Sequence, residues 1–551
     1  MPLSGHPLPP TSPLPILSPR PPPPQLLTMA PTPLLGLLLF LLLPACLGEE
    51  PIPAEPYDLL LSGGTVVDGT GAPARRADVL VREGRIAHVG RVDPDTLEVG
   101  EHFDARGLVV TPGFIDAHAH GDPLETPRFP NFLAMGVTTI LLGQDGGSPQ
   151  VAELPALMRE VEGVRPWVNV AWLVGHNTLR GESGVGFGTP DDAGLAQMAS
   201  LVEAGMEAGA FGLSLGLEYD PGRRAGMEEL VAIARPVAAR NGVVMSHMRN
   251  EDADRVEDSL AELLEQGTRS GARVHASHLK VVLGNDPGQA RRMLQAMAHA
   301  RSQGVEATGD VYPYTASFTG LAILFPDWAR PPHDYDAVVR ARRDELAAHL
   351  RDRVESRNGP EATLFGTGRW AGRTLAQVAR EVGRPFEEVL VELGPGGARA
   401  AYFVMDDEVM ATFLQDPHVV VASDGSPGMN HPRGYGSFPR VLRRFVQEEG
   451  RLTLEEAVRK MTGLTASIVG LDDPARVGVP RGRVEVGWAA DLLVFDPAEI
   501  RDRADFQNPH RLAEGMRAVW VNGIRGWSDD APAPGPGAGQ VLRDAGGNPG
   551  G

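Results

Sequence analysis

The stretch that decides the fold is Thr111-Pro112-Gly113-Phe114-Ile115-Asp116-Ala117-His118-Ala119-His120, a short apolar run that ends in two histidines. Side chains alternate between the two faces of a β-strand, so the imidazoles of His118 and His120 point to the same side. Two imidazoles on one side of a strand end can bind one divalent metal ion. A His-x-His pair also arises by chance, and a solvated strand end is the alternative interpretation.

Seven more strand-like runs follow this stretch, and each of them ends at a polar residue of a metal-binding or catalytic type. The eight predicted strands cover residues 114–120, 136–143, 168–175, 211–217, 243–247, 274–278, 307–310 and 419–424. Amphipathic segments of helical length, such as 192–208 and 254–266, fill the gaps. Eight strand–helix units predict an α/β fold, a (β/α)8 TIM-like barrel, whose chemistry lies at the C-terminal strand ends.

The segments outside the barrel predict further parts. Short β runs in 57–112 and in 471–527 are expected to form one small β-sandwich domain from both chain ends. The barrel itself is assigned to 113–470, with an inserted helical subdomain at about 326–417. This insertion acts as a lid or specificity wall, or else is peripheral and has no functional part. Residues 528–551 are rich in Gly, Pro and Ala, which predicts a disordered tail.

The first 50 residues are predicted to be a disordered and signal-bearing N-terminus. Residues 34–43 are almost wholly apolar, too short to cross a bilayer but of the length of a secretory signal core, and Met29 is a plausible initiator. The run ends in Leu-Pro-Ala-Cys46, which is similar to the lipobox of bacterial lipoproteins. Cleavage by an ordinary signal peptidase near Gly48 is the alternative. We expect an exported protein that is periplasmic, extracellular or lipid-anchored at Cys46, and a cytoplasmic one if the run is not a signal.

Composition excludes several classes of protein. The net charge is -20 without a basic stripe, which argues against nucleic-acid partners and against binding to an anionic membrane surface. Cys46 is the only cysteine, so an internal disulfide framework and a Cys-rich zinc ribbon are both excluded. Any metal must be held by histidine and carboxylate.

The predicted strand ends supply a complete ligand set for a hydrolytic metal site. Such a site needs ligands that leave an open position, a water and a base. The candidate metal ligands are His118, His120, Asp145, His247 and His278, and the candidate base is Asp424. Asp145 is also a carboxylate able to bridge two metals.

Three other polar residues lie on the predicted strands. His176 and Glu218 follow the third and fourth strands, and we expect them to support the ligands or to anchor loops. His275 lies three residues before His278, so strand alternation predicts that it faces the helices.

Several motifs together carry a resemblance to a known family over residues 58–523. They are Thr111 to His120, Gly136-Val-Thr-Thr, Ser246-His-Met-Arg, Ser277-His-Leu-Lys, Asp310-Val-Tyr-Pro-Tyr, Ser423-Asp-Gly, His431-Pro-Arg-Gly-Tyr-Gly, Gly487-Trp-Ala-Ala-Asp and Asn508-Pro-His. The chain resembles the amidohydrolase superfamily and, within it, the D-aminoacylase family of N-acyl-D-amino-acid deacylases.

This resemblance implies a zinc site of one or two ions, with other divalent metals as alternatives. His118 and His120 match the family's first metal pair, His247 and His278 match the second, and Asp424 matches the catalytic aspartate that takes a proton from the attacking water and returns it to the leaving amine.

One position departs from the family pattern. The family reads Gly-Asn-Cys-Gly, with a thiolate ligand, where this chain reads Gly143-Gln144-Asp145-Gly146. A carboxylate keeps the negative charge but should lower the preference for soft zinc, which leaves manganese and cobalt open.

The implied reaction is hydrolysis of the linear amide of an N-acyl-D-amino acid to a carboxylic acid and a free D-amino acid. The substrate's α-carboxylate needs cationic or hydroxyl donors, and the candidates are Arg249, Lys280, Tyr312 and Arg433. For each of them a structural ion pair or a core phenol is the alternative. The expected partner is a small N-acyl amino acid or a short peptide, with membrane contact only through an N-terminal lipid anchor. The alternative functions are hydrolysis of D-residue peptides or cyclic amides, and a non-catalytic barrel.

Overall fold

The computed structural model describes residues 56–529 and 531–546. The predicted signal segment and Cys46 lie outside the described residues, so export and acylation stay predictions. Within the described part of the chain, no helix is both long enough and apolar enough to cross a membrane.

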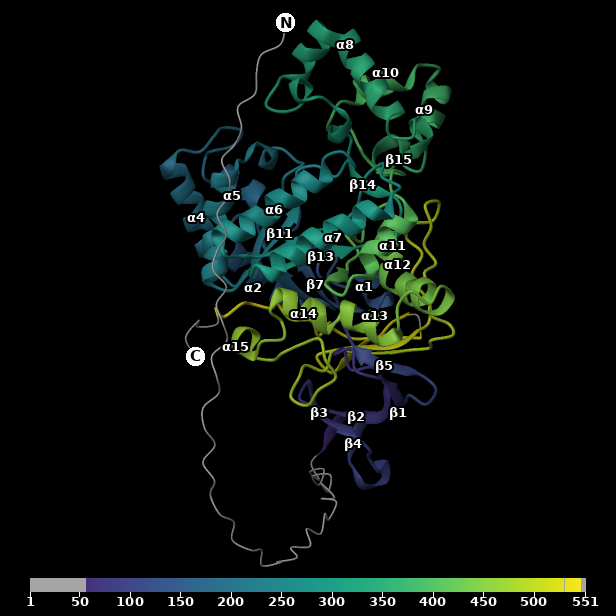
Figure 1. Cartoon of the computed structure of the whole chain (residues 1–551). Coiled ribbons are helices and arrows are strands. Elements are labelled where there is room, and N and C mark those ends of the chain that lie inside the picture. The colour runs from purple at the N-terminus through teal and green to yellow at the C-terminus, as the bar shows by residue number, and fades with distance from the viewer. Residues whose placement is uncertain (1–55, 530, 547–551) are drawn as a thin grey trace, which may run out of the picture. The chain divides into compact units, whose positions relative to one another are not determined.

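A barrel of parallel strands forms the centre of the structure (Figure 1), as the sequence predicted. Its strands are β6 (Phe114–Asp116), β7 (Val137–Leu142), β8 (Asn169–Trp172), β9 (Val174–Gly175), β10 (Gly212–Gly216), β11 (Val243–His247), β12 (Arg273–Ala276), β13 (Ala307–Val311) and β17 (Val419–Val421). They pair in parallel as β6-β7-β8 and as β9-β10-β11-β12-β13-β17. β8 and β9 are separated by Leu173 alone. An isolated parallel bridge between Ala119 and Gly425 connects the segments that directly follow the first and last strands.

Amphipathic helices cover the outside of these strands (Figure 1). They include α2 (Leu154–Val164), α4 (Asp192–Glu207), α5 (Met227–Ala239), α6 (Val256–Ser270), α7 (Pro287–Ser302), α11 (Asp407–Gln415) and α13 (Leu454–Met461). Four of these helices, α4, α7, α11 and α13, have a side-chain cap at the first turn. Asp191, for example, accepts a hydrogen bond from the Gly194 amide at the start of α4, and Thr453 accepts one from the Glu456 amide at the start of α13. Such caps satisfy amides that have no partner within the helix.

Strands from both chain ends form one nine-stranded sheet. The N-terminal strands are β1 (Tyr57–Val66), β2 (Arg75–Arg82), β3 (Arg85–Gly90), β4 (Val99–Asp104) and β5 (Val109–Pro112), and the C-terminal ones are β18 (Leu492–Phe495), β19 (Met516–Val521), β20 (Ile524–Ser528) and β21 (Ala531–Pro532). The two halves meet where β5 pairs antiparallel with β18. Only Gly113 separates β5 from β6, so this sheet fixes the start of the strand that leads to His118 and His120; the strand itself ends at Asp116, before both histidines.

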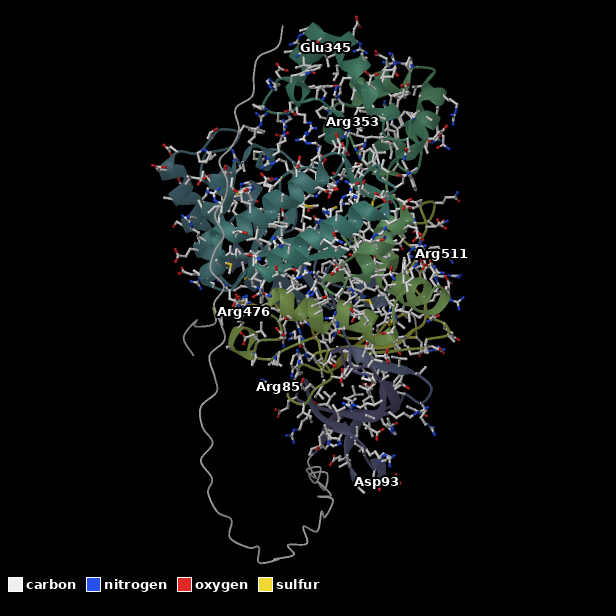
Figure 2. All side chains as sticks on the ribbon, in the orientation of Figure 1. Arg85, Asp93, Glu345, Arg353, Arg476 and Arg511 are labelled. Atoms are coloured by element: carbon white, nitrogen blue, oxygen red, sulfur yellow. The ribbon has the colours of Figure 1, made fainter. Side chains whose placement is uncertain are left out.

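The insertion between β13 and β17 is more than helical. It holds α8 (Tyr335–Glu355), α9 (Leu375–Val382) and α10 (Phe386–Leu393), but also an antiparallel sheet of β14 (Ser317–Gly320), β15 (Thr363–Phe365) and β16 (Arg399–Tyr402). Strands of three or four residues carry too little alternation to be recognised in the sequence. The sheet begins before residue 326, and α11 packs against the barrel helix α7, so the insertion is shifted towards the N-terminus relative to the predicted 326–417. Arg353, labelled in Figure 2, connects α8 to the barrel by an ion pair with Asp252 at 2.8 Å.

The predicted disorder of 528–551 is wrong for residues 531–546. β21 pairs with β20, and Val541 bridges Val170 of β8, whose amide donates to the Gln540 carbonyl. Arg476, labelled in Figure 2, pairs with Asp544 at 2.6 Å, and both side chains are buried. The segment is ordered by backbone pairing with a strand edge, which composition does not reveal.

Candidate metal centre

A cavity opens at the C-terminal ends of the barrel strands. Its barrel side is lined by His120, Asp145, Glu218, His247, Glu251, His278, Lys280, Tyr312, Asp424 and Arg433. The insertion completes the wall with Phe318, Thr319, Ile323, Arg357 and Arg399. The insertion therefore forms part of the cavity wall, in line with the specificity-wall interpretation.

Two groups of potential ligands converge in this cavity and share Asp145. In the first, the Nε2 atoms of His118 and His120 lie 3.4 and 3.6 Å from the two carboxylate oxygens of Asp145. His120 Nε2 is also 3.2 Å from Asp424 Oδ1. In the second, His247 Nδ1 and His278 Nε2 lie 3.5 and 3.4 Å from Asp145 Oδ1. The structure thus brings together all six residues that the sequence proposed as ligands or base.

The environment of His118 tests whether these residues fit a metal ion. The side chain is fully buried, yet neither ring nitrogen has a hydrogen-bond partner within the described residues. A buried polar atom without a partner is costly, whereas a bound cation would accept its lone pair. Imidazole nitrogens and carboxylate oxygens are both ordinary zinc ligands. The donor set therefore fits zinc.

The electrostatics of the cluster favour a cation. Burial lowers the pKa of His118, which keeps that ring neutral and able to coordinate. Burial alone would raise the pKa of Asp145, but His118, His247 and His278 hold this pKa well below its usual range. Burial alone would lower the pKa of His247, but Glu251 and the neighbouring carboxylates raise it to about 10. The same field that stabilises a proton on His247 would stabilise a metal ion.

Three of these residues have left-handed backbone conformations. The φ angles are +55° at Asp145, +36° at His278 and +48° at Asp424. Residues other than glycine rarely adopt this region, and such strain is concentrated at functional sites. Hydrogen bonds from the His278 amide to Asp310 Oδ1 and from the Asp424 amide to the His118 carbonyl, both 2.8 Å, hold two of these turns. The turns end the strands and direct the side chains into the cavity.

Three of the four proposed substrate contacts line the cavity. The Arg433 guanidinium carbon lies 4.6 Å from the Tyr312 ring centre, and its Nη2 is 2.9 Å from Asp424 Oδ1. Lys280 is buried and pairs with Glu251 at 2.7 Å.

The fourth, Arg249, lies elsewhere. Its guanidinium pairs with Glu262 at 2.9 Å and donates to the Arg223 and Ala225 carbonyls, which is the structural ion pair given as the alternative. β11 ends at His247, so strand alternation no longer places Arg249 beside it.

The remaining strand-end residues divide between the site and the barrel wall. Glu218 reaches the site, with Oε2 3.0 Å from His247 Nε2, whereas His176 pairs with Glu229 at 2.8 Å. The expectation that His275 faces the helices is wrong. Its Nε2 lies 2.8 Å from Oδ2 of the buried Asp310. The prediction failed because β12 ends at Ala276, so strand alternation does not relate His275 to His278.

Glu251 is the site residue that sequence reasoning missed. Its Oε1 lies 3.2 Å from His278 Nδ1 and 2.7 Å from Lys280 Nζ. It follows His247 by four residues on the loop after β11, and an acidic residue so close to a ligand histidine was the available signal.

Comparison with known proteins agrees with this geometry. A family model described as "Amidohydrolase family" matches residues 347–525. The D-aminoacylase of Alcaligenes xylosoxydans xylosoxydans is 34% identical over 526 residues, covering 89% of this chain and 98% of the relative. An N-acyl-D-glutamate deacylase from the same organism is 35% identical, covering 89% and 97%.

A solved structure extends the similarity to three dimensions. The N-acyl-D-glutamate deacylase of Bordetella bronchiseptica, complexed with zinc and a phosphonate inhibitor that mimics the tetrahedral intermediate, matches with a TM-score of 0.77 at 33% identity. The match covers 89% of this chain and 100% of that one. Since fold, ligand residues and full-length similarity agree, this chain belongs to the D-aminoacylase family of the amidohydrolases.

Proposed function

We propose that the chain is a metal-dependent amidohydrolase that hydrolyses N-acyl-D-amino acids to a carboxylic acid and a free D-amino acid. The observation that carries this proposal is the pair of ligand groups that share Asp145, with Asp424 beside them. The N-acyl-D-amino-acid deacylases named among its relatives support the substrate class.

Zinc, as one or two ions, would be held by His118, His120, Asp145, His247 and His278, and Asp424 lies beside the first of these ligand groups. When bound, it polarises a carbonyl oxygen and lowers the pKa of a coordinated water. Manganese or cobalt are alternatives because Asp145 is a hard oxygen donor.

Asp424 is placed to transfer the proton. Burial alone would raise its pKa, but Arg433 and the nearby histidines lower it, so the carboxylate is ionised at neutral pH. Its Oδ1 is oriented by His120 Nε2 at 3.2 Å and Arg433 Nη2 at 2.9 Å. Asp424 accepts a proton from the attacking water and donates it to the departing amine nitrogen.

Arg433 and Tyr312 are placed to bind the substrate's α-carboxylate. Arg433 Nε is buried without a hydrogen-bond partner among the described residues, and the Tyr312 hydroxyl meets only the weak acceptor Met405 Sδ, at 3.6 Å. Two donors are therefore free for a carboxylate. Lys280, already paired with Glu251, adds positive charge next to Tyr312.

The test of this proposal compares the wild type with Asp424→Asn on N-acetyl-D-amino acids, D-residue dipeptides and a cyclic amide. The variant keeps the ligand histidines, so we expect it to retain metal and to lose at least about a hundredfold in kcat on the N-acetyl-D-amino acids. Hydrolysis of only the dipeptides or the cyclic amide would replace the proposed substrate class with that alternative. An Asp424→Asn variant as active as the wild type would contradict the proposed base.

We also propose that the chain is exported through the apolar run at 34–43, with Cys46 as the acylated residue of a lipoprotein. The sequence pattern ending at Cys46 supports this localisation. Fractionation of cells that express the wild type and Cys46→Ser tests it. Membrane-bound wild type and released variant are expected, and identical fractions would favour cleavage near Gly48 or retention in the cytoplasm.

A further inference from the structure

We propose that Glu251 and Glu218 are positioning residues that fix which ring nitrogen His278 and His247 present to the metal ion. This inference concerns the metal site of the proposed function but depends on no substrate. Neither carboxylate was among the ligands predicted from the sequence, and both line the cavity.

His278 and Glu251 form the first pair. His278 Nε2 faces Asp145 at 3.4 Å, and the opposite nitrogen, Nδ1, lies 3.2 Å from Glu251 Oε1. A neutral imidazole that coordinates through Nε2 carries its hydrogen on Nδ1, and that hydrogen needs an acceptor. The His278 and Glu251 side chains are 1% and 6% exposed, so water cannot readily supply one. Glu251 is the carboxylate within reach.

His247 and Glu218 form the second pair, in which the two ring nitrogens have exchanged roles. His247 Nδ1 faces Asp145 at 3.5 Å, while Nε2 lies 3.0 Å from Glu218 Oε2. Tyr219 packs on the His247 ring, with 4.5 Å between ring centres, and limits its rotation. One histidine therefore presents Nδ1 and the other Nε2, and each has a carboxylate on the nitrogen that faces away from Asp145.

Lys280 provides the competing explanation for Glu251. Its Nζ lies 2.7 Å from Glu251 Oε1 and also 2.7 Å from His278 Nδ1. An ammonium group can only donate, so Lys280 competes with Glu251 for Nδ1, and coordination of a metal ion through Nε2 requires that Nδ1 donate to Glu251 instead. Glu251 could be needed only to neutralise this buried ammonium group. In that case removing Lys280 and Glu251 together would leave the metal site intact. If Glu251 orients His278, the double variant must still lose metal affinity.

The experiment measures zinc affinity of the purified full-length chain by competition with a chromogenic chelator. The variants are Glu251→Leu, Lys280→Met, the Glu251→Leu/Lys280→Met double variant and Glu218→Leu. Exposed Glu257→Gln is the matched control, because its partner Arg292 is also exposed. The double variant replaces a buried ion pair by apolar side chains of similar size, a change that proteins commonly tolerate. Thermal unfolding of the metal-free proteins identifies any variant that fails to fold.

We expect zinc affinity to fall by about 10- to 100-fold in Glu218→Leu and in the double variant, as for other residues that orient metal ligands. Lys280→Met and Glu257→Gln should bind zinc at least as tightly as the wild type. A folded double variant with wild-type affinity would overturn the role of Glu251, and an unchanged Glu218→Leu would overturn that of Glu218. A chain that shows this pattern but cleaves no N-acyl-D-amino acid would contradict the proposed function and leave the positioning roles standing. A wild type without zinc affinity would overturn both.

Discussion

Asp145 is the single side chain on which both ligand groups depend, because its two oxygens face four histidines. It occupies the position at which the D-aminoacylase family pattern has a cysteine. A carboxylate and a thiolate carry the same charge but differ in softness, so this residue should tune metal preference rather than create the site.

Asp145→Cys should therefore shift metal selectivity. We expect the ratio of zinc to manganese affinity to rise on the order of tenfold, because a thiolate is the softer ligand. Asp145→Asn, which removes the charge, should weaken binding of both metals. Competition titrations with each metal measure the ratio, and an unchanged ratio in Asp145→Cys would show that this side chain does not coordinate.

Tyr312 and Arg249 allow the substrate contacts to be tested against each other. Tyr312→Phe removes a free hydroxyl from the cavity, and a hydrogen bond to a charged group is worth about 1.5–3 kcal/mol, so kcat/KM should fall by about 10- to 100-fold. Arg249→Met should leave KM unchanged, because Arg249 pairs with Glu262 away from the cavity. Steady-state kinetics on an N-acetyl-D-amino acid decide this, and the reverse ranking would return Arg249 to the substrate site.

At the level of elements, the C-terminal segment stabilises the barrel by attaching to β8. Asp544→Ala should destabilise the fold by about 3–5 kcal/mol, because Arg476 would remain buried without its carboxylate. The neighbouring Arg543→Ala is the control: its pair with Glu162 is exposed, and such a pair is worth at most about 1 kcal/mol. Urea unfolding measures both, and equal stabilities would mean that the segment contributes nothing.

The helix α13 carries Lys460, a buried lysine with a lowered pKa. Burial lowers the pKa of Lys460 to about 8, and its ammonium donates to the Asp416 and Val419 carbonyls. The unfolded chain keeps this proton up to a pKa near 10.5, so between pH 8 and 10.5 the unfolded state binds more protons and stability rises with pH.

Comparison with Lys460→Met isolates this effect. The free energy of unfolding of the wild type relative to the variant should increase by about 2 kcal/mol from pH 7 to pH 9.5. Urea unfolding at the two pH values gives the difference. A difference independent of pH would show that Lys460 has an ordinary pKa.

For the whole molecule, the barrel and its ligand set were predictable because each strand end carries a chemically distinctive residue. His118 and His120 follow β6 within four residues of its end, although the predicted strand 114–120 is longer than the observed Phe114–Asp116. The positions of Asp145 and Asp424 follow from the rule that barrel strands end on one side. Glu251 could not be placed in this way, because its distance from His278 depends on the path of a loop. The order of residues 531–546 depends on backbone pairing with β8, which side-chain composition does not encode.

The insertion between β13 and β17 contributes to the cavity as well as to the fold. Phe318 and Arg399 lie in its small sheet, yet they line the cavity whose floor is formed by barrel residues. The barrel carries the candidate ligands and base, and the insertion supplies part of the cavity wall. The two parts of the site therefore come from different segments of one chain.

The most direct test of the central claim is metal removal followed by metal return, with both enantiomers of one N-acetyl amino acid as substrates. We expect chelation to abolish acetate release, zinc to restore it, and the restored activity to be confined to the D-enantiomer. Activity that survives chelation, or equal hydrolysis of the L-enantiomer, would contradict the claim.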